Sequence, residues 1–307
     1  MADQDHQNQT IIIGAGIVGS SLAYFLSKAS PETNILVLDR SISDIVGSTG
    51  YAPGFIGQYN EKPSLTKLAI DSVKEYTKLN TGFSRLELPI AGSNAGTKAL
   101  FFPDDGVAEP KVLCSAYRSM ASENRPHFSE SHPIYPLDHE VSPTPFMRWP
   151  ESHVYARDHG ARYGVGTYDH TPQHVSSPGH TATVPWQDEL FNPAVTRAIA
   201  DRFSADAEFT KHPPFGAEKI GGVFSVTPDN MPLLGPVAGV EGLWMAVAIW
   251  VTHAAGCARL LEKMILGEAY DEAIARDLHP GRFEGRSEEE LEVTALKQYN
   301  DIYSTDC

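Results

Sequence analysis

The N-terminal part of the chain has two short runs of apolar residues, and between them apolar residues recur with the period of an α-helix. Residues 10–13 are apolar and β-branched and lead into a glycine, which is typical of a buried strand. Between residues 17 and 28 the apolar side chains recur at helical spacing, and Ser30-Pro31 ends that pattern. A second apolar run follows at 35–38. We therefore predict a compact β-α-β unit whose two strands lie in a parallel sheet.

The rest of the chain changes its pattern along its length. Residues 40–57 are rich in Ser, Thr and Gly, which indicates a loop, and Pro63 and Pro110 each open a stretch of helical period. Residues 125–215 are dense in Pro and His, which together with short strand-like pieces indicates a β-rich domain. Further elements are expected as strands or apolar runs at 86–102, 163–168, 181–184, 223–226 and 243–249, and as helices at 192–203, 254–266 and, behind a Ser287–Glu290 capping box, 288–299.

This order of elements predicts an α/β fold with two domains. One domain is discontinuous and comprises about residues 1–124 and 216–307. The other is the smaller, β-rich stretch of about residues 125–215. The second part of the discontinuous domain ends in the C-terminal helix.

The composition of the chain limits which kinds of molecule it can bind. The formal net charge of −15 over 307 residues argues against a nucleic-acid partner and against an anionic membrane, because both would be repelled. Residues 242–258 carry no Asp, Glu, Lys or Arg but fall short of the roughly 20 apolar residues of a spanning helix. The polar N-terminus has no signal-peptide pattern, and the three cysteines have no disulfide-like or metal-like spacing. We expect a cytoplasmic protein; the oligomeric state stays open.

A glycine-rich loop joins the first predicted strand to the first helix. Gly14-Ala15-Gly16-Ile17-Val18-Gly19 has the spacing G-x-G-x-x-G, and Asp39 ends the next strand. The first glycine permits a tight turn, the second lets a pyrophosphate approach, and the third lets helix and strand pack closely. The free N–H groups of the helix N-terminus would bind the diphosphate, and Asp39 would accept hydrogen bonds from the ribose. The loop therefore predicts a Rossmann-like dinucleotide site.

Three later segments carry a family resemblance. Residues 47–54 read Gly-Ser-Thr-Gly-Tyr-Ala-Pro-Gly, residues 224–236 contain Thr-Pro-Asp-Asn-Met-Pro, and residues 248–256 contain Trp-Val-Thr-His. With the glycine loop, these segments resemble the D-amino-acid oxidase-like FAD oxidoreductases, and within them the dimethylglycine and sarcosine dehydrogenase branch. The resemblance implies FAD as the cofactor, a discontinuous FAD-binding domain and a β-rich substrate domain.

The resemblance also implies which residues hold FAD. They come from the glycine loop, from Asp39 and the residue after it, from residues 47–54, and from the two later segments. The full set is Gly14, Ala15, Gly16, Ile17, Val18, Gly19, Asp39, Arg40, Gly47, Ser48, Thr49, Gly50, Tyr51, Ala52, Gly54, Asp229, Leu233, Trp250, Thr252 and His253.

The activity implied by the resemblance is oxidation of the C–N bond of an N-methylated amino acid or a related secondary or tertiary amine. A hydride equivalent would pass from the carbon beside the nitrogen to flavin N5, and the imine would then hydrolyse. The candidate catalytic residues are His253, His139 and Tyr168, each with a packing or capping role as the alternative. His170, His174 and His180 match no zinc spacing, so we predict no metal.

Three departures from the family pattern refine these expectations. The branch has a flavin-linked His where Tyr51 stands, so FAD is expected to be non-covalent. Its His-Gln-Tyr segment appears here as His139-Glu140-Val141. Compared with the family pattern, this chain lacks several tens of residues after about Asn124. Their absence would leave the sheet of the FAD domain with an uncovered edge. No folate-binding domain is expected after Tyr299.

Two alternatives remain open at this point. A shortened relative could have lost its activity and persist as a nucleotide-binding or interaction protein. An NAD-dependent dehydrogenase would explain the glycine loop but not residues 47–54 and 248–256.

Overall fold

The computed structural model describes residues 9–85, 104–124, 146–149, 153–158, 163–176, 183–187, 219–300 and 302. The chain divides into two compact units, one of Met1–Pro143 with Met231–Glu284 and one of Thr144–Asn230 with Gly285–Cys307. The boundaries near 124 and 216 that the sequence suggests stay predictions, and the last helix groups here with the second unit. The strands expected at 86–102 and the helix expected at 192–203 lie outside the described residues.

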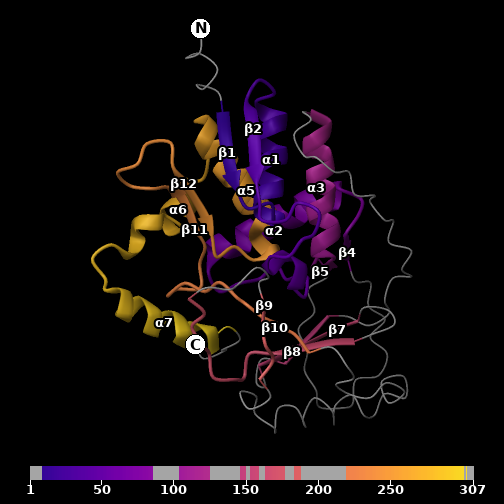
Figure 1. Ribbon diagram of the computed structural model, residues 1–307, viewed down its shortest axis with the longest axis vertical. Helices are drawn as coiled ribbons and strands as arrows, with labels where there is room; N and C mark the ends of the chain where they lie inside the picture. The colour runs from indigo at the N-terminus through magenta and orange to yellow at the C-terminus, as the bar shows by residue number, and fades with distance from the viewer. Residues whose placement is uncertain are drawn as a thin grey trace. The chain divides into compact units, whose positions relative to one another are not determined.

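The first unit begins with the β-α-β arrangement that the apolar pattern predicts. Strand β1 (Gln9–Ile13) and strand β2 (Asn34–Leu38) pair in parallel, with Ile11 opposite Leu36. Helix α1 (Ile17–Ala29) connects them, and Figure 1 shows it lying against the two strands. Ile12 and Val37 are buried because their side chains share one face of this pair.

The opposite face of the β1–β2 pair is apolar and exposed. Within the described residues β1 and β2 pair only with each other. Ile11 is 54% exposed, Ile13 88% and Leu38 46%. Such side chains are typical of a strand buried on both faces, so the pattern of β1 and β2 is that of a larger sheet. The uncovered sheet edge expected from the shortened middle of the chain stays a prediction, because residues 86–103 and 125–145 lie outside the described residues.

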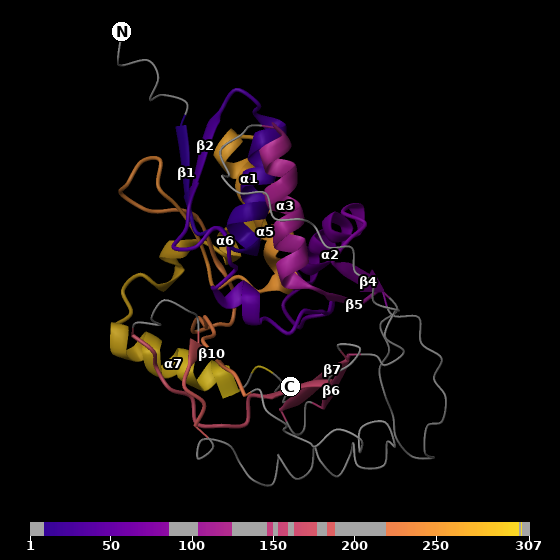
Figure 2. The same cartoon turned by 45° about the vertical axis from the view of Figure 1, so that its right-hand side comes forward.

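Four helices form the core of the first unit. Helices α3 (Pro110–Asn124) and α5 (Ala254–Leu266) pack against α1, and α2 (Pro63–Lys78) packs against α5 (Figures 1 and 2). At their centre the ring of Tyr117 lies 5.7 Å from that of Phe25 and 6.5 Å from that of Tyr76. All three rings are fully buried, so this aromatic cluster fixes how the helices pack.

Short strands complete the first unit. Their bounds and those of the small helices are η1 (Ser48–Tyr51), β3 (Phe55–Ile56), β4 (Phe83–Arg85), β5 (Gly106–Ala108), β11 (Leu233–Pro236), β12 (Trp244–Val247), η5 (Val251–His253), α6 (Glu272–Asp277) and η6 (Pro280–Phe283). The expectation of a plain loop over 40–57 is wrong in part, because η1 and β3 lie within it. No local pattern signals β3, since its partner β5 lies about 50 residues later and pairs with it antiparallel.

The second unit contains an antiparallel sheet of β6 (Met147–Trp149), β7 (Val154–Asp158) and β8 (Tyr163–Thr167), and a short pair of β9 (Thr183–Val184) and β10 (Gly221–Gly222). The apolar run at 223–226 forms no strand. Helix α7 (Glu288–Asn300) starts at the expected cap, where the Ser287 hydroxyl accepts from the Glu290 N–H at 3.2 Å. None of the helices described in the structure is long and apolar enough to cross a membrane.

Candidate functional site

The glycine loop is a tight turn between β1 and α1. Gly14 has φ +104°, which only glycine adopts freely, and its N–H donates to the Leu38 carbonyl at 2.7 Å. A Cβ on Gly19 would lie 1.9 Å from the Gly14 carbonyl oxygen, closer than any real contact. Gly14 and Gly19 are therefore required by the fold of the loop itself, as the spacing predicts.

Asp39 and Thr49 hold the loop from two sides. The Asp39 carboxylate accepts from the Ala15 N–H at 2.6 Å through one oxygen and from the Ser41 N–H at 3.1 Å through the other. The Thr49 hydroxyl accepts from the Ile17 N–H at 3.1 Å and so caps α1. Each carboxylate oxygen keeps a second lone pair for a further donor such as a ribose hydroxyl.

The Gly16 N–H has no hydrogen-bond partner within the described part of the chain, and Gly16 is only half-buried. A Cβ on Gly16 would lie 2.9 Å from the Thr49 hydroxyl oxygen. The loop thus leaves one amide open beside the N-terminus of α1, where the helix dipole favours an anion. This arrangement fits a diphosphate, which needs such donors and a position without a side chain.

The segment 47–54 lies beside this loop through Thr49. Ser48 and Tyr51 are exposed, as is Arg40 after β2, whereas Gly47, Gly50 and Ala52 are half-buried. Gly54 is buried with φ +76°, and its carbonyl accepts from the Ala108 N–H at 2.7 Å. A Cβ on Gly50 would lie 2.1 Å from the Ile45 carbonyl oxygen. These glycines serve the turn itself.

A second candidate region is the turn that runs from Trp250 through η5 into α5. The His253 side chain is only 4% exposed, and its ring lies 6.1 Å from that of Trp250. Burial lowers the pKa of His253 from 6.5 to about 4, so its imidazole is neutral at neutral pH. Leu233, on β11, is half-buried in the same unit.

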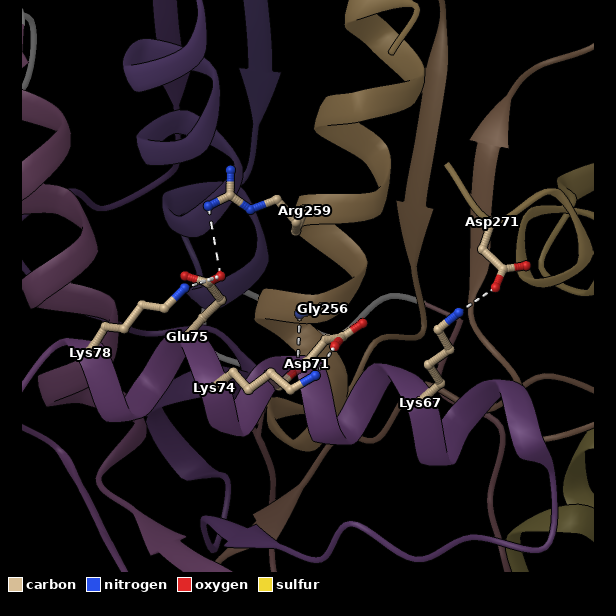
Figure 3. A network of polar contacts seen from close by, with 9 residues as sticks. Lys67, Asp71, Lys74, Glu75, Lys78, Gly256, Arg259 and Asp271 are labelled. Carbon is tan, nitrogen blue, oxygen red and sulfur yellow. Dashed lines mark hydrogen bonds and ion pairs between the residues drawn. The ribbon is translucent and has the colours of Figure 1, made fainter. Parts of the chain in front are cut away.

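Helix α2 and strand β3 anchor this turn. The Tyr76 hydroxyl donates to the Val251 carbonyl at 2.6 Å, the Gly256 N–H donates to the Ser72 hydroxyl at 2.9 Å, and the Thr252 hydroxyl donates to the Phe55 carbonyl at 3.0 Å. Figure 3 shows Gly256 of α5 joined to α2 in this way. A Cβ on Gly256 would lie 2.3 Å from the Leu68 carbonyl oxygen, so glycine permits the close packing of α5 on α2.

Ion pairs along the outer side of α2 add to this contact. Glu75 accepts from Lys78 at 2.8 Å and lies 3.7 Å from Arg259 of α5 (Figure 3). Lys67 pairs with Asp271, the residue that caps α6. The two lysines are exposed, so their pairs each contribute about 1 kcal/mol or less, whereas Glu75 and Arg259 are only partly exposed. The sequence patterns identified neither Tyr76 nor Ser72 as anchors, because both read as ordinary helix positions.

Replacing Tyr76 with phenylalanine is expected to lower the free energy of unfolding by about 1 kcal/mol, because the buried Val251 carbonyl would lose the Tyr76 hydroxyl and keep only the Ala254 N–H as a donor. Chemical denaturation in urea would measure the change. Tyr117→Phe is the matched control, since the buried Tyr117 hydroxyl has no partner in the described part of the chain. That variant should be neutral or slightly more stable. Equal losses in both variants would contradict the role given to the Tyr76 hydroxyl.

The other candidates lie in the second unit or outside the described residues. The Tyr168 ring packs 5.4 Å from Tyr299 and 5.9 Å from Phe224, in an aromatic cluster of the second unit. The Asp229 carboxylate accepts from the Thr227 hydroxyl at 3.0 Å. His139 lies outside the described residues. The roles given to these three residues stay predictions.

The histidine group considered for metal binding does not converge in the described part of the structure. His170 hydrogen-bonds the Tyr299 hydroxyl at 2.8 Å, and His174 lies 2.9 Å from Glu292. His180 lies outside the described residues. Among the described side chains no group of three or more His, Cys, Asp or Glu residues is placed to hold a metal ion.

Comparison with known proteins finds relatives for the part of the chain that contains the loop. Residues 9–93 match the family model described as "DAO: FAD dependent oxidoreductase". Human mitochondrial dimethylglycine dehydrogenase is 23% identical to this chain in an alignment 389 residues long. The alignment covers 90% of this chain but only 44% of the human protein. The chain thus spans less than half the length of this relative. The match confirms the resemblance expected from the sequence, and it confirms FAD rather than NAD as the cofactor of the family.

Solved structures share the fold. The crystal structure of L-proline dehydrogenase from P. horikoshii has a TM-score of 0.61 at 15% identity and covers 89% of this chain and 97% of its own. Iminodiacetate oxidase from Chelativorans sp. BNC1 has a TM-score of 0.58 at 15% identity and covers 85% of this chain and 96% of its own. These similarities confirm the α/β fold class.

Proposed function

We propose that this chain, whose residues 9–93 match the family model of FAD-dependent oxidoreductases, binds FAD without a covalent bond and oxidises the C–N bond of a small amino acid that is a secondary or tertiary amine. The observation that supports this most is the open Gly16 amide at the N-terminus of α1, within the residues that match the family. Dimethylglycine, proline and iminodiacetate, after which the relatives are named, are all amines of this kind.

The adenine half of FAD would lie at the glycine loop. Gly16 and the first turn of α1 would donate to the diphosphate, with Thr49 as a further hydroxyl beside it. Asp39 would accept from the ribose through the lone pairs that Ala15 and Ser41 leave free. Glycine at position 16 keeps the approach open because it carries no side chain.

The turn at 250–253 would lie near the reacting centre. A bound flavin supplies the two-electron acceptor that the protein itself lacks. A histidine with a pKa of about 4 is a weak base, so His253 would orient the substrate or the ring by hydrogen bonding and would not take up the amine proton. Tyr76, Ser72 and Phe55 would keep this turn in place.

The cofactor is expected to be non-covalent because Tyr51 stands at the position of the flavin-linked histidine of the dehydrogenase branch. The purified protein should show absorption bands at about 370 and 450 nm, as any bound flavin does. Denaturation should release all of the flavin into the supernatant. Flavin that stays with the precipitated protein would contradict this part of the proposal.

Activity can be tested by anaerobic reduction of the bound flavin. Sarcosine, dimethylglycine, L-proline and iminodiacetate would be added in turn, and loss of absorbance at about 450 nm would report oxidation of the amine. Glycine and acetate serve as controls for a primary amine and for a carboxylate without nitrogen. A protein that neither contains flavin nor takes up added FAD would refute the proposal.

A second candidate function is nucleotide binding without catalysis. The exposed apolar face of the β1–β2 pair favours it, because a sheet that has only these two strands among the described residues would position a cofactor less rigidly. This candidate predicts a flavin that binds and is reduced by dithionite but by none of the amines. The anaerobic titration therefore separates the two functions.

A further inference from the structure

The carbonyl oxygen of Ala15 is surrounded by hydrogen-bond donors. It accepts from the Ser20 hydroxyl at 2.9 Å and from the Cys114 thiol at 3.3 Å. It also accepts from Arg118 of α3, through Nε at 3.1 Å and through Nη2. Donors from three side chains therefore share the two lone pairs of this oxygen, and they come from both α1 and α3.

Arg118 also holds a second segment. Its Nη1 donates to the Ile42 carbonyl at 2.8 Å. The guanidinium is planar and presents its donors in a fixed fork, so one side chain joins the loop after β1 and the loop after β2 to helix α3. Both loops carry residues proposed above to bind the adenine half of FAD.

The direction of the Ala15 carbonyl decides the direction of the Gly16 amide. In a trans peptide the C=O and the N–H of one unit point in opposite directions, and the structure contains no cis peptide among the described residues. Because Arg118 draws the Ala15 oxygen toward α3, the Gly16 N–H must point away from α3. This N–H is the one amide between Gly14 and Ile17 that has no partner in the described part of the chain.

We propose that Arg118 is a positioning residue for FAD: it fixes the Ala15–Gly16 peptide so that the Gly16 N–H donates to the diphosphate. This proposal rests on the proposed FAD binding. Arg118 does not itself contact the cofactor. Its positive charge lies behind the peptide and polarises it, which makes the amide a stronger donor to an anion.

The test compares Arg118→Met and Arg118→Lys with the wild-type protein. Titration of the apo proteins with FAD and with ADP, followed by calorimetry well below the melting temperature, gives the dissociation constants. Arg118→Met should bind both ligands about tenfold more weakly, the effect expected for loss of one charge-assisted contact. Arg118→Lys keeps the charge but not the fork, so its affinity should lie between the two.

The phosphorus NMR signals of bound FAD provide a readout that loss of packing alone would not move. They should shift in Arg118→Met because a diphosphate oxygen loses the Gly16 donor. Asn124→Ala is the matched control, since Asn124 also joins α3 to α1, through the Ser27 hydroxyl at 3.4 Å, but lies far along the helix from the loop. It should leave both affinities and both phosphorus signals unchanged.

Two outcomes would overturn the proposal, and they are distinguishable. If the wild-type protein binds FAD and Arg118→Met binds FAD and ADP within twofold of it, with unchanged phosphorus signals, then Arg118 only packs α3 against α1. If the wild-type protein binds neither ligand, the proposed function fails and the role of Arg118 fails with it.

Discussion

Replacing Gly19 with alanine is expected to abolish FAD binding. A Cβ at this position would lie 1.9 Å from the carbonyl oxygen of Gly14, and a backbone oxygen cannot move away as a flexible side chain would. The loop would have to open, which would displace the Gly16 amide and the first turn of α1. We expect the dissociation constant for FAD to rise about a hundredfold or more, equivalent to about 2.7 kcal/mol.

Flavin content after purification and a titration with FAD would measure this effect. Gly222→Ala is the control, because a Cβ there has no heavy atom within 4 Å and the position lies in the second unit. The control should keep its flavin and its melting temperature. Full retention of flavin by Gly19→Ala would show that the diphosphate does not lie at this loop.

The second large effect concerns pH. Burial lowers the pKa of His253 from 6.5 to about 4, so the folded state resists protonation where the unfolded state accepts it. Well above pH 6.5 neither state is protonated at this residue, and it contributes no pH dependence there. As the pH falls from 6.5 toward 4, only the unfolded chain takes up the proton, and the free energy of unfolding falls by about 3 kcal/mol.

Urea denaturation at several pH values between 4 and 8 would measure this change, with His253→Gln as the reference that cannot titrate. Other groups contribute equally to both proteins, so the difference between the two curves isolates His253. That difference should be flat above about pH 7, and below it the wild-type protein should lose stability relative to His253→Gln. Parallel curves over the whole range would mean that His253 is not buried in a neutral form.

The local patterns of the sequence predicted the parts of the fold whose contacts are local. The β-branched runs gave β1 and β2, the helical period and Ser30-Pro31 gave α1, and the Ser287 cap marked the start of α7. The residues 254–266 were predicted as a helix and form α5 with the same bounds. Helix caps and strand runs involve residues a few positions apart, so a sequence window contains them completely.

The glycine loop is the part of the site that the sequence determined. Gly14 has a positive φ, and a Cβ at Gly16 or Gly19 would come too close to a neighbouring atom. Only glycine meets these requirements, so the spacing of the three glycines is visible in the sequence. The family resemblance extended this reading to FAD. The short strand β3 was missed, because its pairing with β5 depends on residues far along the chain.

Only the tertiary structure decided how the loop and the turn at 250–256 are held. Thr49 caps α1 from 32 residues away, Arg118 reaches the Ala15 carbonyl across 103 residues, and Tyr76 reaches Val251 across 175. The burial of His253, and with it the fall of its pKa, likewise depends on the packing of distant helices. The sequence determines which residues are suited to a turn, a helix cap or the core. Which partners they contact follows from the packing of α2, α3 and α5, and this packing joins residues too far apart for any short stretch of sequence to reveal.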